Sequence, residues 1–499
     1  MRFYEIDGEL QEAVNGGEGV VRLRVEILLE GEIFCVPEQD ILQASFYSIK
    51  EVAGGVSSRG EILIDNTLGF INGNADCRNG VGMEVRVWFS VGECARYFKR
   101  FTFFTDEKGV QVIKGPGRKR FVRLGLRDLS YTLRKIDEAR DWTAPAVFTY
   151  SVVCDKTQPQ KSLVHRIAQR AGIGVGDIDC PTIPVTLPFV RLRRNVWAEL
   201  SSLATACRCH LEFTPDNRLV FSYSPYQIEE LNYTEIGHTF SGEDIFYLRK
   251  IARDDLYRNT VRLKVNMPVA LQKQEIWRYD EPPVFYDENL QAYYPFRYPL
   301  VREIEAGSYE ARYKIIEKCG RERNVIFADE IDTKEEAEKR LEYEGGGFSY
   351  SHYDTSGFDK AFLTLRKEAD GDLYRAAIYG RPIVLDLNRS SFMRNAEEVA
   401  LFGTVALNIT GSYFSEYEID GIPQYEDWVI RELAERVQNR RGFTVRTHRG
   451  VFNARVGARV KIKEKREESE GTINALSFRY KRNAAFVATF RLMEHRGRI

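Results

Sequence analysis

The stretch from Arg194 to Tyr223 constrains the chain most, because it joins three short elements that cannot fold alone. Residues 195–206 carry apolar side chains at helical spacing, which predicts a short amphipathic helix. A Pro-Asp-Asn turn at 215–217 then separates two strand patterns, 210–213 and 219–222. A helix followed by a two-stranded ribbon has too little core of its own. We therefore expect this stretch in the middle of the protein, with flanking domains packed around it.

Short strand patterns dominate both ends of the chain. Apolar and polar residues alternate between turn signals from 19 to 128 and again from 443 to 493. Tyr and Phe greatly outnumber Met, which favours β-structure. Helical spacing also occurs at 156–173 and at 425–439. The sequence therefore predicts a mainly β protein with α+β insertions, and a barrel or sandwich for residues 1–140.

Charge and targeting signals bear on the class of protein. The 72 basic residues balance 73 acidic ones, so the chain lacks the basic excess of a dedicated nucleic-acid binder. Residues 1–16 contain acidic side chains and no apolar run, which predicts neither a signal nor a transit peptide. No stretch approaches ~18 consecutive apolar residues, so we expect no membrane-spanning helix. The eight cysteines are scattered, and we expect them to be reduced and mostly buried.

The residue patterns that could carry chemistry are incomplete. Cys207, Cys209 and His210 form a Cys/His cluster without the usual zinc spacing or an obvious fourth ligand, so we interpret them as buried structural residues rather than a metal site. His352 and Asp354 could pair as a base and its orienting acid. No G-x-S-x-G or H-E-x-x-H motif accompanies them, and we interpret them as part of an exposed or interface loop. We therefore predict no catalytic, cofactor-binding or metal-binding residues and no cofactor.

Three charged segments have simpler structural interpretations. Residues 115–120 resemble a phosphate loop but lack the G-K-[ST] ending and a following helix, so we expect a hairpin tip that could touch an acidic neighbour. Residues 332–344 carry opposite charges at i,i+4 spacing, which predicts a solvated helix. Residues 464–470 are predicted to form an exposed charged loop between two strands.

The order of several segments resembles that of bacteriophage tail hub proteins, which close the end of a tail tube. Residues 61–70 form a strand that ends in an Asp-Asn turn with Gly69, similar to a "strand, D-N-x-x-G-x-F" element of that family. Strand patterns at 82–88 and 97–102 follow in the family's order, although Phe-Phe stands where "F-x-G" is usual. The run C-x-C-x-L-E-F-T-P-D-N-R-L-V-F resembles the family's central helix and hairpin, with Asn217 where Gly is usual.

Later segments extend the resemblance. The Tyr-Gly-Arg-Pro run at 379–382 resembles the hub's "Y-G-x-P-V" strand pair, and the R-V-G-A-R-V-K-I run around Gly457 resembles a strand of hub C-termini. The resemblance covers about 1–265 and 373–499. It divides the chain into a first tube-like β-barrel domain at 1–140, an α+β domain at 141–225, the start of a second tube-like β-barrel at 226–267, a distal inserted region at 268–372, and the rest of the second barrel at 373–499.

The resemblance implies a structural virion protein rather than an enzyme. Three chains, each with two barrels, would form a ring of six between a hexameric tail tube and a threefold tip, spike or fibre protein. The implied partners are a homotrimer, the tail tube or a distal tail protein, the tip, spike or fibre protein and a tape measure protein, with DNA only in transit during ejection. Contact with the host envelope would be transient, during host cell attachment. The implied location is the distal tail, baseplate or tail tip of a virion assembled in the host cytoplasm.

A channel that passes DNA should not hold its phosphates, because each Lys or Arg contact adds salt-dependent affinity. We therefore expect a neutral or acidic channel wall. A second interpretation is a tail-associated cell-wall hydrolase or a carbohydrate-binding tip protein. The chain has ample carboxylates for a glycosidase pair, and residues 279–299 are rich in tyrosine. Hydrolysis of peptidoglycan by the purified chain would favour this second interpretation.

Overall fold

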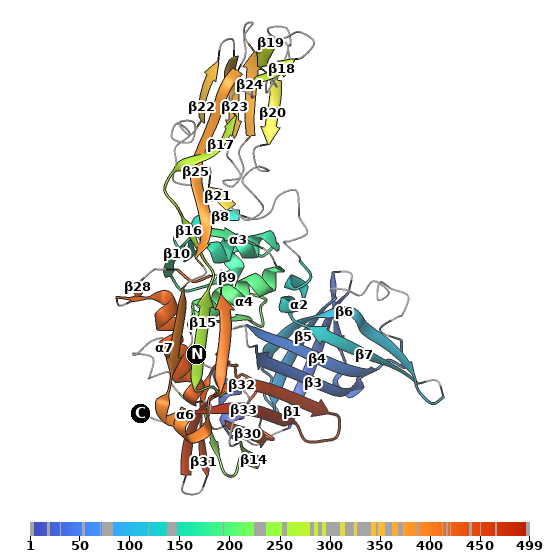
Figure 1. Cartoon of the computed structure of the whole chain (residues 1–499). Helices are drawn as coiled ribbons and strands as arrows, with labels where there is room; N and C mark the ends of the chain where they lie inside the picture. The colour runs from blue at the N-terminus through green and yellow to red at the C-terminus, as the bar shows by residue number, and fades with distance from the viewer. Residues whose placement is uncertain are drawn as a thin grey trace.

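Strands make up most of the computed structural model, and a few helices accompany them (Figure 1). The structure describes residues 4–16, 20–29, 31–51, 55–69, 71, 83–117, 119–136, 147–192, 194–223, 236–251, 257–279, 284–287, 292–295, 310–314, 324–326, 341–345, 348–354, 362–367, 373–386, 389–411, 413–415, 418–419, 421–438, 442–449, 451–464 and 467–495. The prediction of a mainly β protein with α+β insertions is confirmed.

The first block of strands comes from the N-terminal quarter of the chain. Its elements are α1 (Gly8–Gly16), β1 (Val21–Leu29), β2 (Glu32–Val36), η1 (Glu38–Asp40), β3 (Ile41–Lys50), β4 (Val56–Asp65), β5 (Glu84–Val91), β6 (Phe98–Lys114), β7 (Arg120–Arg127) and α2 (Leu129–Leu133). The turn after β4 forms as its sequence predicts. Gly69 has φ +76°, and the buried Asn66 side chain exchanges two hydrogen bonds with the backbone of Ile71.

The last block comes mainly from the C-terminal end. It comprises β13 (His238–Ser241), β14 (Ile245–Ile251), β30 (Gly442–Thr447), β31 (Arg459–Glu464), β32 (Glu467–Lys481) and β33 (Val487–His495). These strands do not form a separate sheet, and the two tube-like barrels remain a prediction. Antiparallel pairing of β3 with β32 joins both blocks into one 13-stranded sheet, in the order β14-β30-β33-β32-β3-β4-β7-β6-β5-β1-β2, with β31 and β13 branching from β32.

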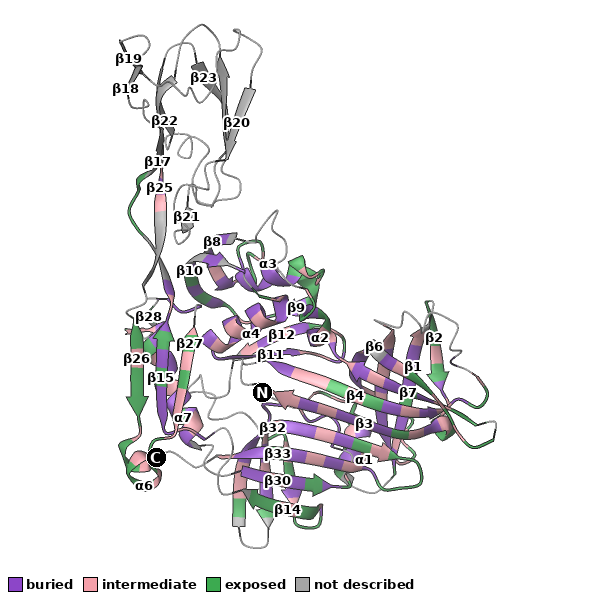
Figure 2. Ribbon diagram, turned by 45° about the vertical axis from the view of Figure 1, so that its right-hand side comes forward, coloured by how far each residue is buried: buried purple, intermediate pink, exposed green. Residues whose placement is uncertain are grey.

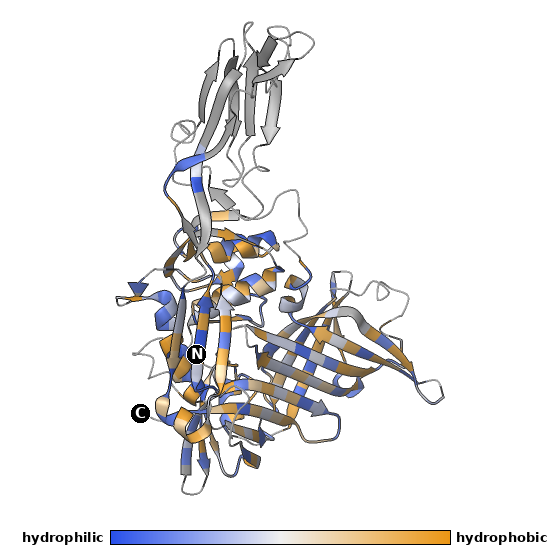
Figure 3. Ribbon diagram, viewed as in Figure 1, coloured by the Kyte–Doolittle hydropathy of each residue, from blue (hydrophilic) through white to orange (hydrophobic). Residues whose placement is uncertain are grey.

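One hydrophobic core lies under both blocks. Apolar and polar residues alternate along the strands (Figure 3), so every second side chain points into this core. Phe46 of the first block is buried in it and stacks on Phe103 at 5.9 Å between ring centroids. Phe478 of the last block lies 5.8 Å from Phe89 of the first. The two ends of the chain therefore stabilise each other through shared aromatic packing as well as through the β3–β32 ladder.

A second core belongs to an α+β unit beside the large sheet. Its elements are β8 (Val147–Cys154), α3 (Leu163–Arg170), η3 (Val175–Asp177), β9 (Ile178–Asp179), β10 (Ile183–Arg191), α4 (Val196–Ala206), β11 (Cys209–Phe213), β12 (Leu219–Tyr223), β15 (Thr260–Val265), β26 (Ser390–Arg394), α6 (Ala396–Phe402), β27 (Ala406–Gly411), β28 (Glu418–Ile419), β29 (Ile422–Pro423) and α7 (Gln424–Gln438). Figure 2 shows its purple, buried residues concentrated where the helices meet the strands.

Local signals position the helices of this unit. Asn195 caps α4 by accepting a hydrogen bond from the Ala198 amide at 2.9 Å. The buried Trp428 of α7 donates its indole N–H to the Thr205 carbonyl at 2.8 Å, which ties α7 to the end of α4. The segment expected to start the second barrel is divided between two parts of the fold. Its strands β13 and β14 join the large sheet, whereas β15 pairs with β26 and β27 under α7. The division of the chain into five segments remains a prediction.

Further strands occupy the expected inserted region. They are β16 (Met267–Ala270), β17 (Gln274–Tyr279), β18 (Val284–Asp287), β19 (Ala292–Pro295), β20 (Glu310–Lys314), β21 (Asn324–Ile326), β22 (Leu341–Gly345), β23 (Phe348–Asp354), β24 (Phe362–Lys367) and β25 (Leu373–Asp386). In Figure 1 they extend away from the large sheet. The helix predicted at 332–344 is wrong for 341–344, which are strand, and its other residues lie outside the described part. No described helix has the length and apolar character needed to cross a membrane.

Candidate functional site

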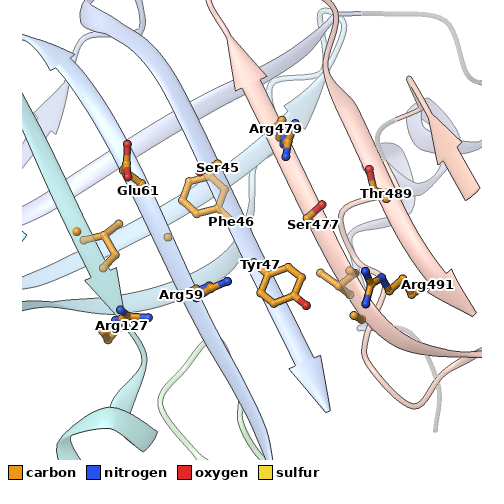
Figure 4. Close-up of a pocket in the computed structure, with 15 residues that line it drawn as sticks. Ser45, Phe46, Tyr47, Arg59, Glu61, Arg127, Ser477, Arg479, Thr489 and Arg491 are labelled. Atoms are coloured by element: carbon orange, nitrogen blue, oxygen red, sulfur yellow. The ribbon is translucent and has the colours of Figure 1, made fainter. Parts of the chain in front are cut away.

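The outer side of the large sheet, where the two blocks meet, is the best candidate for a functional surface. Because side chains alternate along a strand, Ser45 and Tyr47 point to the side opposite the buried Phe46. We call the outward-facing residues of β7, β4, β3, β30 and β14, together with those of β32 from Ala475 onward and of β33 up to Arg491, the shared wall. Figure 4 shows its centre, where strands from both ends of the chain run side by side. A hollow of about 660 Å³ lies over this centre.

The strand registers place the wall residues in rows that cross the junction. One row follows directly from the pairs in adjacent strands: Arg127–Arg59–Tyr47–Ser477–Thr489–Arg446. A neighbouring row contains Glu61, Ser45 and Arg479. The wall is therefore one surface to which both blocks contribute, although its central strands β3 and β32 lie more than 400 residues apart in the chain.

The shared wall is strongly basic. Its cationic residues are Arg59, Arg123, Arg127, Arg249, Arg446, Arg479, Lys481 and Arg491, and its acidic residues are Glu61 and Asp65. Eight cations against two carboxylates give an excess of six positive charges, although the whole chain has a net charge of −1. This face therefore differs from the neutral or acidic wall that we expected for a DNA channel.

Part of the wall's positive charge has no neutralising carboxylate among the described residues. Arg123 forms an ion pair with Glu61 at 3.3 Å. The guanidinium of Arg59 lies over the Tyr47 ring, 5.1 Å from its centroid, which holds the side chain without cancelling its charge. No described residue forms an ion pair or hydrogen bond with the exposed Arg479 and Arg491.

Both carboxylates of the wall are already occupied. Glu61 is bound by Arg123, as above. Asp65 accepts hydrogen bonds from the hydroxyl and the amide of Thr67. These bonds, above all the one from the hydroxyl, hold the pKa of Asp65 below its usual value. The two groups lie in different rows of the sheet, so they do not form a convergent acid pair.

The wall continues into a hollow of about 510 Å³ beside α2. Asp128 lies there as the N-cap of α2, and its carboxylate accepts hydrogen bonds from the amides of Ser58 and Ser130. Burial raises the pKa of Asp128 to about 6 despite these bonds. At the same edge, Arg134 pairs with Glu51 at the end of β3. This edge anchors the first helix after the sheet to the wall.

A buried ion-pair network joins the α+β unit to the large sheet. Arg208 follows α4 with φ +52° and binds Glu432 at 3.2 Å and Glu435 at 2.8 Å, both from α7. Lys50, at the end of β3, reaches Glu435 at 3.2 Å. Burial by itself would raise the pKa of Glu435, but the charges of Lys50 and Arg208 lower it to about 2. Sequence analysis missed this network because its partners are more than 200 residues apart and match no motif.

The expected structural role of Cys207, Cys209 and His210 fits their burial. Cys207 ends α4, whereas the other two residues lie on β11, so the three are not on one strand. Burial raises the pKa of the Cys207 thiol to about 12 and lowers that of the His210 imidazole. That the three residues bind no metal stays a prediction.

The expectation that all cysteines are reduced is wrong for one pair. Cys154, at the end of β8, and Cys180, after β9, form a disulfide that spans 26 residues. The buried His165 of α3 lies beside both sulfurs, with its Nδ1 2.7 Å from the Ser162 hydroxyl. Neither cysteine stands in a recognisable motif, so only the fold brings this Cys/His group together.

The other segments singled out in the sequence have structural roles where they are described. Residues 115–120 form the tip between β6 and β7, closed by the Gly115 amide on the Lys119 carbonyl at 2.9 Å, as expected. His352 and Asp354 lie on strand β23 rather than in a loop, and their side chains lie outside the described part. The loop predicted at 464–470 is wrong for 464 and 467–470, which belong to β31 and β32, and residues 465–466 lie outside the described part.

Comparisons with known proteins give structural neighbours only. No protein-family model matches the chain, and no curated protein matches its sequence. The 43 kDa tail protein of prophage MuSo2 from Shewanella oneidensis has 9% identity and a TM-score of 0.49, covering 95% of this chain and 98% of that one. A tail protein from Neisseria meningitidis MC58 has 9% identity and a TM-score of 0.48, covering 95% and 97%. A third neighbour is the Escherichia coli c3393 protein, a component of the type VI secretion system, with 8% identity and a TM-score of 0.41, covering 92% and 74%. These structural neighbours are thus phage-type tail proteins and a secretion-system component.

Proposed function

We propose that this chain is a structural protein of a phage tail or tail-like particle, and that it forms the hub at the distal end. The observation that carries this proposal is the shared wall, to which the first and last strand blocks contribute neighbouring strands over one core. The ordered motifs that resemble tail hub proteins support the same proposal. The virion's distal tail, baseplate or tip is the corresponding location.

Symmetry explains why two joined blocks suit a hub. Three copies of a chain with two strand blocks present six blocks around an axis, which matches a hexameric tube on one side and a threefold tip, spike or fibre protein on the other. The sheet of a single chain ends in β14 and β2. Packing these ends against neighbouring copies would cover edges that otherwise invite aggregation. We propose that the shared wall faces the axis, because its side chains are polar and its apolar side is already filled.

The remaining parts of the chain would contact other tail components. The α+β unit and the strands β17–β25 lie to one side of the large sheet (Figure 1). We propose that they meet the tip, spike or fibre protein, while the opposite end of the sheet meets the tail tube or a distal tail protein. A tape measure protein and DNA in transit would occupy the channel, and contact with the host envelope would be transient. Interfaces above ~2,000 Å² are expected for such an obligate assembly.

We propose a structural rather than an enzymatic role. Glycosidases need two carboxylates that converge on one cleft. In the shared wall, Glu61 is bound by Arg123 and Asp65 by Thr67, so neither is poised as an acid or base. Peptidoglycan hydrolysis by the purified chain would contradict this role and favour a tail-associated hydrolase.

Reconstruction of the assembled particle tests the proposal. We expect three copies of this chain around the tail axis, with Tyr47 and Ser477 of the shared wall facing the channel. The test requires whole particles, because the isolated chain lacks the tube on which it would assemble. Six copies, or a position away from the axis, would contradict the hub assignment.

A further inference from the structure

We infer that the shared wall binds the phosphate backbone of duplex DNA, so that it holds DNA rather than only letting it pass. The inferred DNA binding concerns the isolated chain and does not depend on the proposed function. That it acts on DNA in a tail channel rests on the proposed function. The inference reverses the expectation of a neutral or acidic wall, and it follows from the charge, exposure and spacing of the wall residues.

The size of the basic surface suits a duplex. Its seven neighbouring strands, spaced roughly 4.8 Å apart, span about 29 Å. Duplex DNA carries one phosphate per ~1.7 Å of its axis, so a length of 29 Å presents about 17 negative charges. The cations of the wall come from both blocks and from several rows, with five of the eight on the last block. The wall can therefore meet phosphates along a strand of the duplex rather than at one point.

Several cations of the wall are available to a ligand. Arg479 and Arg491 are exposed and have no ion-pair partner among the described residues. Arg59 and Arg446 lie over the rings of Tyr47 and Tyr247, at 5.1 and 4.6 Å from the ring centroids. Such stacking reduces the freedom of the side chain while leaving the guanidinium edge free to donate hydrogen bonds.

The residues between the cations also match a phosphate backbone better than a protein partner. Ser45, Tyr47, Ser477 and Thr489 present hydroxyl groups at the centre of the wall (Figure 4). Arg, Ser, Thr and Tyr side chains are the usual donors to phosphate oxygens. Protein interfaces instead centre on a desolvated cluster of aromatic and apolar anchors. Tyr47 and Tyr247 of the wall form no such cluster, because β32, β33 and β30 lie between their strands and an arginine lies over each ring. We therefore favour DNA over an acidic protein segment.

The wall has no means of reading bases. The hollow at its centre is lined by residues of strands, so no helix there can enter a groove. Binding should consequently be independent of sequence and strongly dependent on salt, with a slope of log K against log salt of about −0.9 per phosphate contacted.

Fluorescence anisotropy with a labelled 30-base-pair duplex tests this inference on the full purified chain. We expect a Kd of roughly 10⁻⁶ to 10⁻⁴ M at about 150 mM NaCl, and much tighter binding at about 50 mM. The double variant Arg479→Gln/Arg491→Gln should flatten the salt slope by about 1.8, since two phosphate contacts are lost. The matched control Arg262→Gln/Lys264→Gln removes the same charge from exposed positions on β15 and should leave the slope unchanged.

Three outcomes would overturn the inference. The first is no binding by the wild-type chain at low salt, and the second is an equal loss in the wall and control variants. The third is tighter binding of poly-L-glutamate than of DNA at equal charge, which would indicate an acidic protein partner. Thermal midpoints of all variants should match the wild type, so that loss of fold is separated from loss of binding.

Particle reconstruction separates this inference from the proposed function. DNA binding through the wall by a protein found away from the tail axis would contradict the hub but leave the binding intact. Three copies around the axis with no DNA binding by the wall would support the hub and contradict the inference.

Discussion

The shared wall and the α+β unit use charged residues in opposite ways. In the wall, arginines such as Arg479 and Arg491 face water and have no ion-pair partner in the described structure. In the α+β unit, Arg208 is buried between Glu432 and Glu435. Charges that a fold buries must be paired, because an unpaired buried charge is very costly. Charges left exposed and unpaired stabilise little, and so they are available to a partner.

The two architectures explain this difference. The large sheet has one core, and its outer side is free to be polar. The α+β unit packs helices against strands and against the large sheet, so polar groups at those contacts are enclosed. Glu199 of α4, for example, is buried and is bound by Arg194 and by the Tyr413 hydroxyl. The following predictions use the comparison between exposed and enclosed charge.

The largest effect is expected for Arg208→Met. This change removes the buried cation that Glu432 and Glu435 share and leaves only Arg436 and Lys50 beside them, so the free energy of unfolding should fall by about 3–5 kcal/mol. Urea denaturation measures it. The control Arg479→Met, in the wall, should change stability by less than about 0.5 kcal/mol. Equal effects of the two variants would show that enclosure does not distinguish the two regions.

A pH dependence should accompany the enclosed network. The folded pKa of Glu435, about 2, lies below its ordinary value of 4.5, so the stability from its ionised form is complete above pH 4.5 and is lost as the pH falls toward 2. Glu435→Gln removes this contribution, which is on the order of 1–3 kcal/mol at neutral pH. Urea denaturation of both proteins between pH 7 and 3 should show their difference in stability shrinking on acidification. A constant difference would contradict the assignment.

A smaller effect of about 1–3 kcal/mol is expected for Gly69→Val, in the turn that leads away from the wall strand β4. Gly69 has φ +76°, a conformation that a β-branched residue adopts only under strain. The control Gly69→Asn should cost less, because Asn tolerates this region. Thermal unfolding compares the three proteins, and an unchanged midpoint for the Val variant would show that the turn adapts.

The smallest effect on stability is expected for Arg479→Gln/Arg491→Gln. Neither side chain has an ion-pair partner in the described structure, so the free energy of unfolding should stay within about 0.5 kcal/mol of the wild type. The same variant should have the clearest effect on DNA binding. A large loss of stability would instead place these arginines among the structural charges of the protein.

Several local elements could be predicted from the sequence because their causes lie within a few residues. The helix expected at 195–206 is α4, which begins after the capping residue Asn195. The turn at 215–217 forms with Asn217 at φ +60°. The helix expected at 156–173 is shorter, because α3 begins at Leu163 after a turn around Pro159. At 341–344, pairing with β25 overrides the helical charge pattern.

The candidate surface illustrates what the sequence alone could not determine. Alternation along β3 and β32 predicts that each strand has a polar face, because the order of residues within a strand is enough to define its two faces. Only the tertiary structure decided that Tyr47 lies opposite Ser477, since a register between strands more than 400 residues apart leaves no local signal. The near-zero net charge concealed the basic wall, because the compensating carboxylates lie elsewhere in the fold. The Cys154–Cys180 bond and the Arg208 network were hidden for the same reason: their partners meet only when distant segments pack together.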